Sequence, residues 1–219
     1  VGGLGHIGAF SFCQDKIMTT GGEGGMLVTN DESIWKRAWA IKDHGKDYDT
    51  VFNRQHRPGF RWLHESFGTN FRMTEMQAAI GRLQLKKLEK WNESRTKNAH
   101  RLIDTFSNYP SIRAPVPDDD IRHAYYRLYA FVVPEHLRDG WDRDRIMVEI
   151  NELGIPCFIG SCPEIYNEKA FERAGLKPET PLPNAKALGP VSLAFLVHPT
   201  LTDDDLDRSC EAIKTVLDQ

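Results

Sequence analysis

Short apolar runs separated by glycine-rich turns occupy the first thirty residues. Residues 7–13 and 25–29 are apolar and bounded by glycine or polar turn residues, which predicts two buried strands around a loop. Asp31 precedes apolar residues at helical spacing, so a helix is expected over residues 31–41 with Asp31 as its N-cap. Glycine, proline and charged residues dominate residues 43–69, which predicts a long loop.

A helical period begins after residue 74. Apolar residues recur at helical spacing as far as residue 106, which predicts one long connecting helix. The proline-rich, acidic tract that follows predicts a crossing into a second domain. Beyond it we expect strands over residues 125–133, 155–158 and 193–197 and helices over residues 142–153 and 202–216. The chain should therefore comprise two domains, residues 1–108 and 109–219, the second a small α+β domain.

Composition and charge are those of an ordinary globular protein. The chain has 219 residues, of which 40% are hydrophobic and 27% charged, and its formal net charge is -3. Such a charge gives no basic footprint for nucleic acid. No apolar run approaches the roughly 20 residues that span a bilayer, and the start lacks signal-peptide features. We therefore expect a soluble cytoplasmic protein that binds neither nucleic acid nor membrane.

The four cysteines are too few and too scattered for a disulfide framework. Cys157 and Cys162 are the nearest pair, and no histidine clusters with them, so a zinc site is not expected. Reduced thiols and no metal are the prediction.

A glycine motif near the start offers a rival interpretation. Gly3, Gly5 and Gly8 form G-x-G-x-x-G, and Asp31 lies near the distance of the acidic ribose ligand in a dinucleotide-binding unit. That motif needs a strand before the glycines and a helix immediately after them, so that pyrophosphate meets a helix N-terminus. The residues after Gly8 favour a strand instead, and this context argues against an NAD(P)-binding oxidoreductase.

Lys16 follows the first predicted strand and precedes a glycine-rich turn. Most lysines are solvated surface residues. A lysine that forms Schiff bases needs a desolvated setting that keeps part of it neutral, and the end of a buried strand would supply one. The glycines permit close approach to a ligand, and the hydroxyl of Ser11 is placed where it could meet a phosphate.

These residues resemble conserved motifs of the DegT/DnrJ/EryC1/StrS aminotransferases, and the similarity extends along nearly the whole chain. The matching segments are Ser11-Phe12-Cys13-Gln14-Asp15-Lys16, Thr19-Thr20-Gly21-Gly22-Glu23-Gly24-Gly25, Val28-Thr29-Asn30-Asp31, Asp43-His44-Gly45, Gly68-Thr69-Asn70-Phe71-Arg72-Met73, Gln77-Ala78-Ala79-Ile80 and Leu196-Val197-His198-Pro199. Cys13 is a departure, because the family often carries histidine there.

The resemblance implies an α/β fold-type-I enzyme that binds pyridoxal 5'-phosphate (PLP) and acts as a homodimer with shared active sites. It further implies that a nucleotide-linked keto sugar is aminated in amino-sugar or surface-polysaccharide synthesis, usually with glutamate as the amine donor. By position, Lys16 would hold PLP and move the proton, and Ser11 would bind the PLP phosphate. Asn70 would reach the phosphate of PLP in the neighbouring subunit, although the spacing alone equally suits a turn or N-cap residue. Arg72 and His198 would contact substrate.

The family's remaining PLP ligands lie upstream of the lysine. The chain begins at Val1 and runs at once into a glycine-rich stretch, so we expect a partial large domain followed by the small domain. We expect this piece alone to bind PLP weakly and to transaminate nothing.

Other functions remain open at this point. A non-catalytic dimerisation module would need none of the upstream ligands. A related PLP enzyme that removes a sugar hydroxyl carries histidine in place of the lysine, and Lys16 argues against it.

Overall fold

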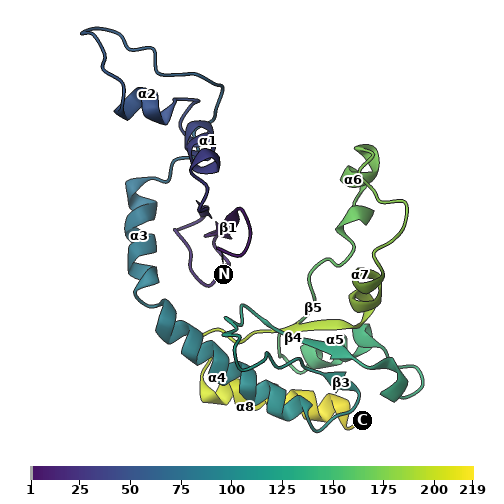
Figure 1. Ribbon diagram of the computed structural model, residues 1–219. Coiled ribbons are helices and arrows are strands. Elements are labelled where there is room, and N and C mark those ends of the chain that lie inside the picture. The colour runs from purple at the N-terminus through teal and green to yellow at the C-terminus, as the bar shows by residue number, and fades with distance from the viewer. Residues whose placement is uncertain (1) are drawn as a thin grey trace. The chain divides into compact units, whose positions relative to one another are not determined.

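The computed structural model describes residues 2–219, which Figure 1 traces as a ribbon. The chain divides into two compact units, one ending at Leu88 and the other running from Glu89 to Gln219. This division precedes the boundary predicted at residue 108. The reason is that helix α4 (Leu88–Phe106) buries its apolar face in the core of the second unit.

The first unit begins with an antiparallel hairpin of β1 (Gly8–Ser11) and β2 (Gly25–Val28). Helix α1 (Glu32–Lys42) follows, and the Asp31 side chain caps it by accepting the backbone N–H groups of its first turn. Both strands and this helix match the prediction, because a cap residue and apolar spacing are strong local signals.

The burial predicted for the two strands is wrong among the described residues. Phe10 of β1 is 39% exposed, and Met26 of β2 is 54% exposed. A hairpin of two strands has no further strand at its edges, and the described residues cover little of either face. The sequence pattern therefore identified the strands but not what covers them.

The long loop between α1 and α3 contains one short helix, α2 (Tyr48–Phe52). Its N-cap is Asp47, whose side chain accepts the Thr50 N–H at 2.7 Å. The ring of Tyr48 packs edge-on against Trp39 of α1, with ring centroids 5.3 Å apart. A local cap and an aromatic contact thus create a helix within the predicted loop.

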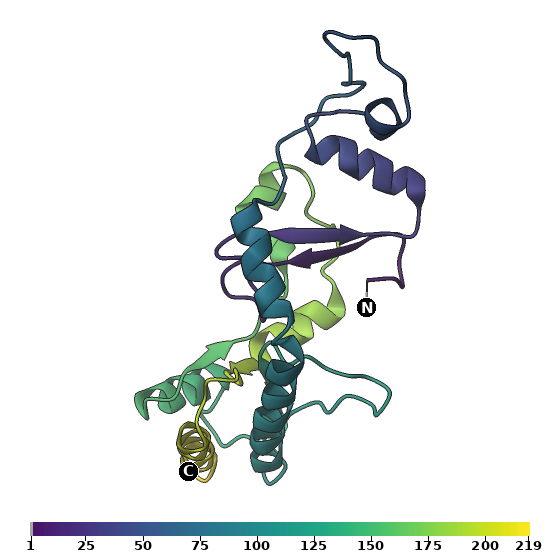
Figure 2. The same ribbon diagram turned by 90° about the vertical axis from the view of Figure 1, so that its left-hand side faces the viewer.

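Helix α3 (Glu75–Leu85) begins with a capping box, in which Thr74 and Gln77 each bond the other's backbone N–H. Figure 2 shows the β1–β2 hairpin beside this helix. The glycine-rich turn between the strands packs on it closely, since a Cβ at Gly21 would lie 2.9 Å from the side chain of Ile80. Gly21 also has a φ of 83°, which only glycine adopts without strain.

The single long helix predicted from residue 74 to residue 106 is instead two helices. Helix α3 ends at Leu85, and α4 begins at Leu88. The N–H of Lys87 bonds the carbonyl of Gln84 at 2.9 Å, a three-residue step that interrupts the helical ladder. Lys86 and Lys87 lie at this break, and lysine favours helix, so no signal in the sequence marked the break.

The second unit contains a four-stranded antiparallel sheet in the order β3-β4-β6-β5. Its strands are β3 (Ile112–Arg113), β4 (Leu128–Val132), β5 (Cys157–Ile159) and β6 (Ser192–Phe195). The three longer strands were predicted, and two-residue β3 was not. Burial alternates along β4, so one face of the sheet points to the core.

Helices α4, α5 (Arg143–Glu152) and α8 (Asp203–Leu217) contribute to that core. Figure 1 shows α4 and α8 side by side, and Arg101 of α4 bonds Asp203 of α8 at 2.9 Å. Asp142 and Thr202 cap α5 and α8 and were marked by the sequence as their first residues. This is the small α+β arrangement that the sequence predicted.

The connections of the second unit hold further short helices that the sequence did not reveal. They are α6 (Lys169–Arg173), α7 (Pro183–Leu188) and the 3₁₀ turns η1 (Pro134–His136), η2 (Ile165–Asn167) and η3 (Gly189–Val191).

The dinucleotide-binding interpretation fails on the geometry. Gly8 is the first residue of a strand, and within residues 2–219 the earliest helix is α1, which begins at Glu32. No helix N-terminus follows the glycines to meet a pyrophosphate. The described residues also form no cluster of three or more potential metal ligands, and none of their helices is long and apolar enough to cross a membrane.

Candidate active site

Lys16 lies in a tight turn directly after β1. Its backbone N–H bonds the carbonyl of Cys13 at 3.2 Å. Its Nζ lies 3.2 Å from Oδ1 of Asp15, and the Cys13 thiol donates to the same oxygen at 2.9 Å. The Lys16 side chain is 38% exposed and that of Asp15 is 51% exposed. The amine is therefore accessible but held by its own turn.

The electrostatic setting of Lys16 differs from the prediction. The hydrogen bond to Asp15, followed by that to Cys13, raises the pKa of Lys16 above its ordinary value, and the small loss of solvation does not reverse this. A desolvated lysine with a lowered pKa was expected from a buried strand end. Because β1 is exposed and Asp15 is adjacent, the charged form is favoured instead.

Ser11 is the last residue of β1, so its hydroxyl lies at the strand end next to the turn. The backbone N–H of Cys13 donates to Oγ of Ser11 at 3.4 Å. Ser11 is exposed, and its hydroxyl hydrogen remains able to donate to an anion.

The segments at residues 43–45 and 69–73 lie side by side at the end of α1. The N–H of Phe71 bonds the carbonyl of Lys42 at 3.0 Å, and the N–H of His44 bonds the carbonyl of Thr69 at 2.9 Å. Asp43 and Asn70 form an isolated antiparallel bridge between the two segments. Two motifs that are far apart in the sequence thus form one local structure.

Arg72 makes an ion pair inside this structure. Its Nη1 lies 2.5 Å from Oδ1 of Asp43, and its Nη2 lies 3.3 Å from Nε2 of His44. Burial of Asp43 opposes ionisation, but the positive charges of Lys46 and Arg72 outweigh it and hold the pKa of Asp43 below its usual range. Sequence reasoning placed Asp43 in a motif but did not identify it as the partner of Arg72.

Asn70 is exposed at this bridge. It is not the N-cap of α3, because Thr74 has that position. Asn70 is therefore not a helix N-cap, and the roles left open for it are those of a turn residue or a ligand-binding residue.

Helix α3 ties the Lys16 region to the segment that carries Asn70 and Arg72. Gln84 accepts the Thr19 N–H at 3.0 Å, and Gln77 donates to the carbonyl of Glu23 at 2.6 Å. The same helix begins directly after Arg72 and Met73. The four predicted site residues of the first unit are therefore connected through one helix.

His198 belongs to the second unit, where it follows β6. Its Nδ1 lies 2.7 Å from the Thr200 hydroxyl, and its carbonyl accepts a hydrogen bond from Asn98 of α4 at 3.1 Å. Burial, reinforced by the positive charge of Arg95, lowers the pKa of His198. It lines a cavity of about 310 Å³ and is favoured as a neutral imidazole there.

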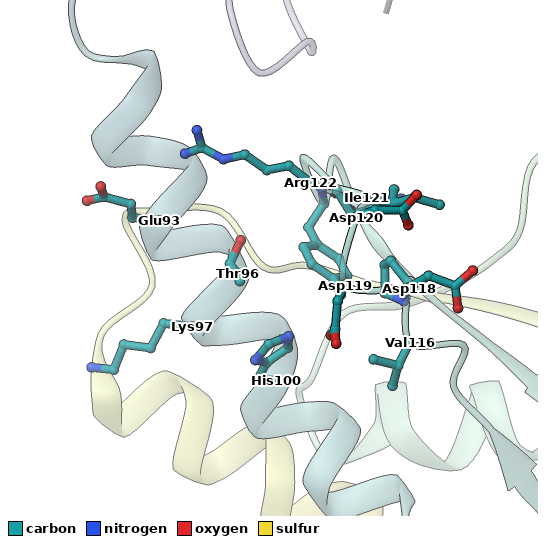
Figure 3. A pocket seen from close by; sticks show the side chains of 13 residues that line it. Glu93, Thr96, Lys97, His100, Val116, Asp118, Asp119, Asp120, Ile121 and Arg122 are labelled. Atoms are coloured by element: carbon teal, nitrogen blue, oxygen red, sulfur yellow. Dashed lines mark hydrogen bonds between the residues drawn. The ribbon is translucent and has the colours of Figure 1, made fainter.

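A second cavity of the same unit, of about 730 Å³, lies between α4 and the segment before β4. Figure 3 shows His100 and Thr96 on one side of it and Asp119 on the other. Its lining includes none of the five site residues predicted from the sequence.

A family model matches the chain over residues 1–214, and its description is the DegT/DnrJ/EryC1/StrS aminotransferase family. The chain belongs to this family. The predicted family is therefore confirmed, and it is a family of PLP-dependent enzymes described as aminotransferases.

Curated relatives give the same result. The spore coat polysaccharide biosynthesis protein SpsC of Bacillus subtilis is 31% identical over 220 residues, which are 99% of this chain and 55% of SpsC. The GDP-perosamine synthase of Caulobacter vibrioides is 29% identical and matches 99% of this chain and 54% of its own length. The chain thus spans about half the length of these relatives.

Solved structures confirm the predicted fold class of an α/β fold-type-I PLP transferase. The aminotransferase from Psychrobacter cryohalolentis aligns with a TM-score of 0.92 and 54% identity, covering 99% of this chain and 57% of that one. A family aminotransferase from Brucella abortus aligns with a TM-score of 0.81 at 23% identity.

The residues around Lys16 fit PLP by their chemistry. A primary amine can bond an aldehyde, and the Ser11 hydroxyl can donate to a phosphate at the same strand end.

Proposed function

We propose that the protein that contains this chain is a sugar aminotransferase that uses PLP to aminate a nucleotide-linked keto sugar. The observation that supports this proposal is the accessible Lys16, held in the turn that follows β1. The chain around it matches an aminotransferase family over residues 1–214. The amine donor is an amino acid, glutamate being our first choice.

The roles of the chain's residues follow from their chemistry. Bound PLP supplies an electron sink for the pair released at the substrate carbon. Lys16 Nζ would hold the cofactor and, as a neutral amine, would move a proton between the substrate carbon and the cofactor. Ser11 donates to the cofactor phosphate. Arg72 and His198 position the substrate, and the Asp43 carboxylate orients Arg72.

Substitution of Lys16 tests the proposal. In the full-length protein, Lys16→Ala and Lys16→Arg should both lose transamination by at least about 10³-fold, because neither side chain offers a neutral amine. Borohydride reduction of the wild-type protein with PLP should leave a pyridoxyl group on the peptide that contains Lys16, as read by mass spectrometry. A Lys16→Ala protein that still retained reducible PLP after dialysis would remove Lys16 from this role.

The substrate class is supported by the relatives. One of them is named a GDP-perosamine synthase and another a dTDP-3-amino-3,4,6-trideoxy-alpha-D-glucose transaminase. We therefore propose action on a nucleoside-diphosphate keto sugar, in the cytoplasm, in amino-sugar or polysaccharide synthesis. Turnover should be assayed with a panel of GDP-, UDP- and dTDP-linked keto sugars and glutamate, and turnover of amino acids alone would contradict the proposal.

We also propose a homodimer with shared active sites, in which Asn70 serves the cofactor of the partner. Asn70 is exposed where it bridges Asp43, which supports a contact outside its own chain.

A further inference from the structure

In the turn that carries the proposed cofactor lysine, two side chains donate to a single carboxylate oxygen of a third. Oδ1 of Asp15 accepts from Lys16 Nζ at 3.2 Å and from the Cys13 thiol at 2.9 Å. The backbone closes the same turn, because the Lys16 N–H bonds the carbonyl of Cys13 at 3.2 Å. The Ser11 hydroxyl oxygen accepts the Cys13 N–H at 3.4 Å, which helps to hold the backbone that carries the thiol.

The Cys13 thiol and the Lys16 amine both contact the same atom of Asp15. Cys13 and Lys16 flank Asp15 in the sequence, and both side chains donate to its Oδ1. The side chain of Asp15 is 51% exposed. The thiol and the amine both contact the same oxygen of its carboxylate, so the thiol contact helps to keep the acceptor for the lysine in place.

We propose that Asp15 and Cys13 are positioning residues for Lys16. Asp15 holds the Lys16 amine at the turn, and the Cys13 thiol fixes the Asp15 carboxylate by donating to the same oxygen. This inference rests on the proposed function, in which Lys16 bonds PLP. It concerns how the chain holds the Lys16 amine in place while that amine is not bonded to the cofactor.

The consequence is a pH-dependent restraint on Lys16. Only the neutral amine can bond an aldehyde, and the Asp15 carboxylate favours the ammonium form. Asp15 and Cys13 both raise the pKa of Lys16, whereas α3 presents the neutral amides of Gln77 and Gln84 to the following turn. Loading with PLP should therefore accelerate as the pH rises.

Asp15→Asn in the full-length protein tests the restraint. The amide lacks the negative charge, so more of Lys16 is neutral at pH 7. The rate of PLP loading, followed by absorbance, should rise by about two- to fivefold, the range expected for an exposed ion pair. In the PLP-free protein, the midpoint of the pH profile for acylation of Lys16 should move to lower pH, as read by peptide mass spectrometry. Asp15→Glu should recover most of the wild-type profile.

Two further variants separate positioning from general disturbance. Cys13→Ser keeps a donor to Asp15 and should leave the acylation profile of Lys16 near wild type. Cys13→Ala removes the donor and should move the midpoint part of the way toward Asp15→Asn. The matched control is Asp49→Asn, which breaks an ion pair with Lys36 elsewhere in the first unit and should not move the Lys16 profile.

Coincident Lys16 profiles in wild type and Asp15→Asn would overturn the role of Asp15. Equal profiles for Cys13→Ala and wild type would overturn the role of Cys13. The acylation profile is read without PLP, so it stands apart from the proposed function, which fails instead if borohydride leaves no pyridoxyl group on Lys16 of the wild type.

Discussion

Asp43 is the most enclosed carboxylate near the proposed site, with a side chain that is 12% exposed. Its partner Arg72 is 42% exposed, so the pair is shielded on one side and open on the other. Removing one partner of a half-shielded ion pair costs more stability than at the surface and less than in a fully buried pair. Arg72 is thus held in place by a carboxylate of its own chain while one face of the guanidinium stays open to a ligand.

Asp43→Asn should destabilise the protein by about 1–2 kcal/mol, because it removes the charge from the hydrogen bond to Arg72. The pKa of Asp43 is lowered in the folded state, so its contribution is present above the ordinary carboxyl pKa of about 3.9 and is lost as the pH falls through the lower folded pKa. Thermal unfolding midpoints should therefore differ between wild type and variant at pH 7 and converge below that value. A difference that persists in acid would contradict the ion pair.

The sequence pointed to candidate site residues but not to the side-chain contacts that they make. The family resemblance implied roles for Lys16, Asn70 and Arg72, and these roles stay predictions. The contacts of Lys16 with Asp15 and of Arg72 with Asp43 were not predicted. Side-chain direction in a turn and pairing across 29 residues depend on the folded backbone, which sequence spacing does not give.

Elements with caps and a clear period were the most predictable. Helices α1, α5 and α8 begin where Asp31, Asp142 and Thr202 predict, since each cap satisfies N–H groups of the first turn. The break between α3 and α4 was missed because the two lysines there suit a continuous helix. The exposure of β1 and β2 was missed because an apolar run indicates a strand that could be buried and does not show which elements cover it.

Buried and exposed positions of helix α5 provide a test of how this helix packs in the core of the second unit. Ile146 is fully buried, whereas Val148 on the same helix is 48% exposed. Ile146→Ala should cost about 2–5 kcal/mol, the range for truncating a buried aliphatic side chain. Val148→Ala should cost less than about 0.5 kcal/mol, as at other surface positions.

The two variants are compared by thermal unfolding of the full-length protein together with limited proteolysis. Cleavage within the second unit should appear at a lower temperature for Ile146→Ala than for wild type. Equal midpoints for both variants would mean that α5 does not pack on the sheet as described.

At the scale of the whole molecule, the two units differ in what they bury. The core cluster comes entirely from the second unit, with Phe106, Leu193 and Ile213 among its fully or almost fully buried members. In the first unit, large apolar side chains such as Trp62 and Met76 are 84% and 77% exposed. Since exposed apolar patches mark contact surfaces, the first unit is the part of the chain suited to association.

Shared active sites make a quantitative prediction for mixed subunits. If Lys16 of one subunit and Asn70 of its partner serve the same site, a heterodimer of Lys16→Ala with Asn70→Ala has one site with both defects and one intact site. Random exchange of equal amounts makes half of the dimers mixed, so activity should recover to about a quarter of the wild-type value for a two-fold dimer. PLP is kept low enough that the Asn70→Ala homodimer is largely inactive alone. The control mixes Lys16→Ala with Ser11→Ala, which lie in the same subunit's site and should not complement. Activity equal to the mean of the two homodimers would assign Asn70 to the site of its own chain.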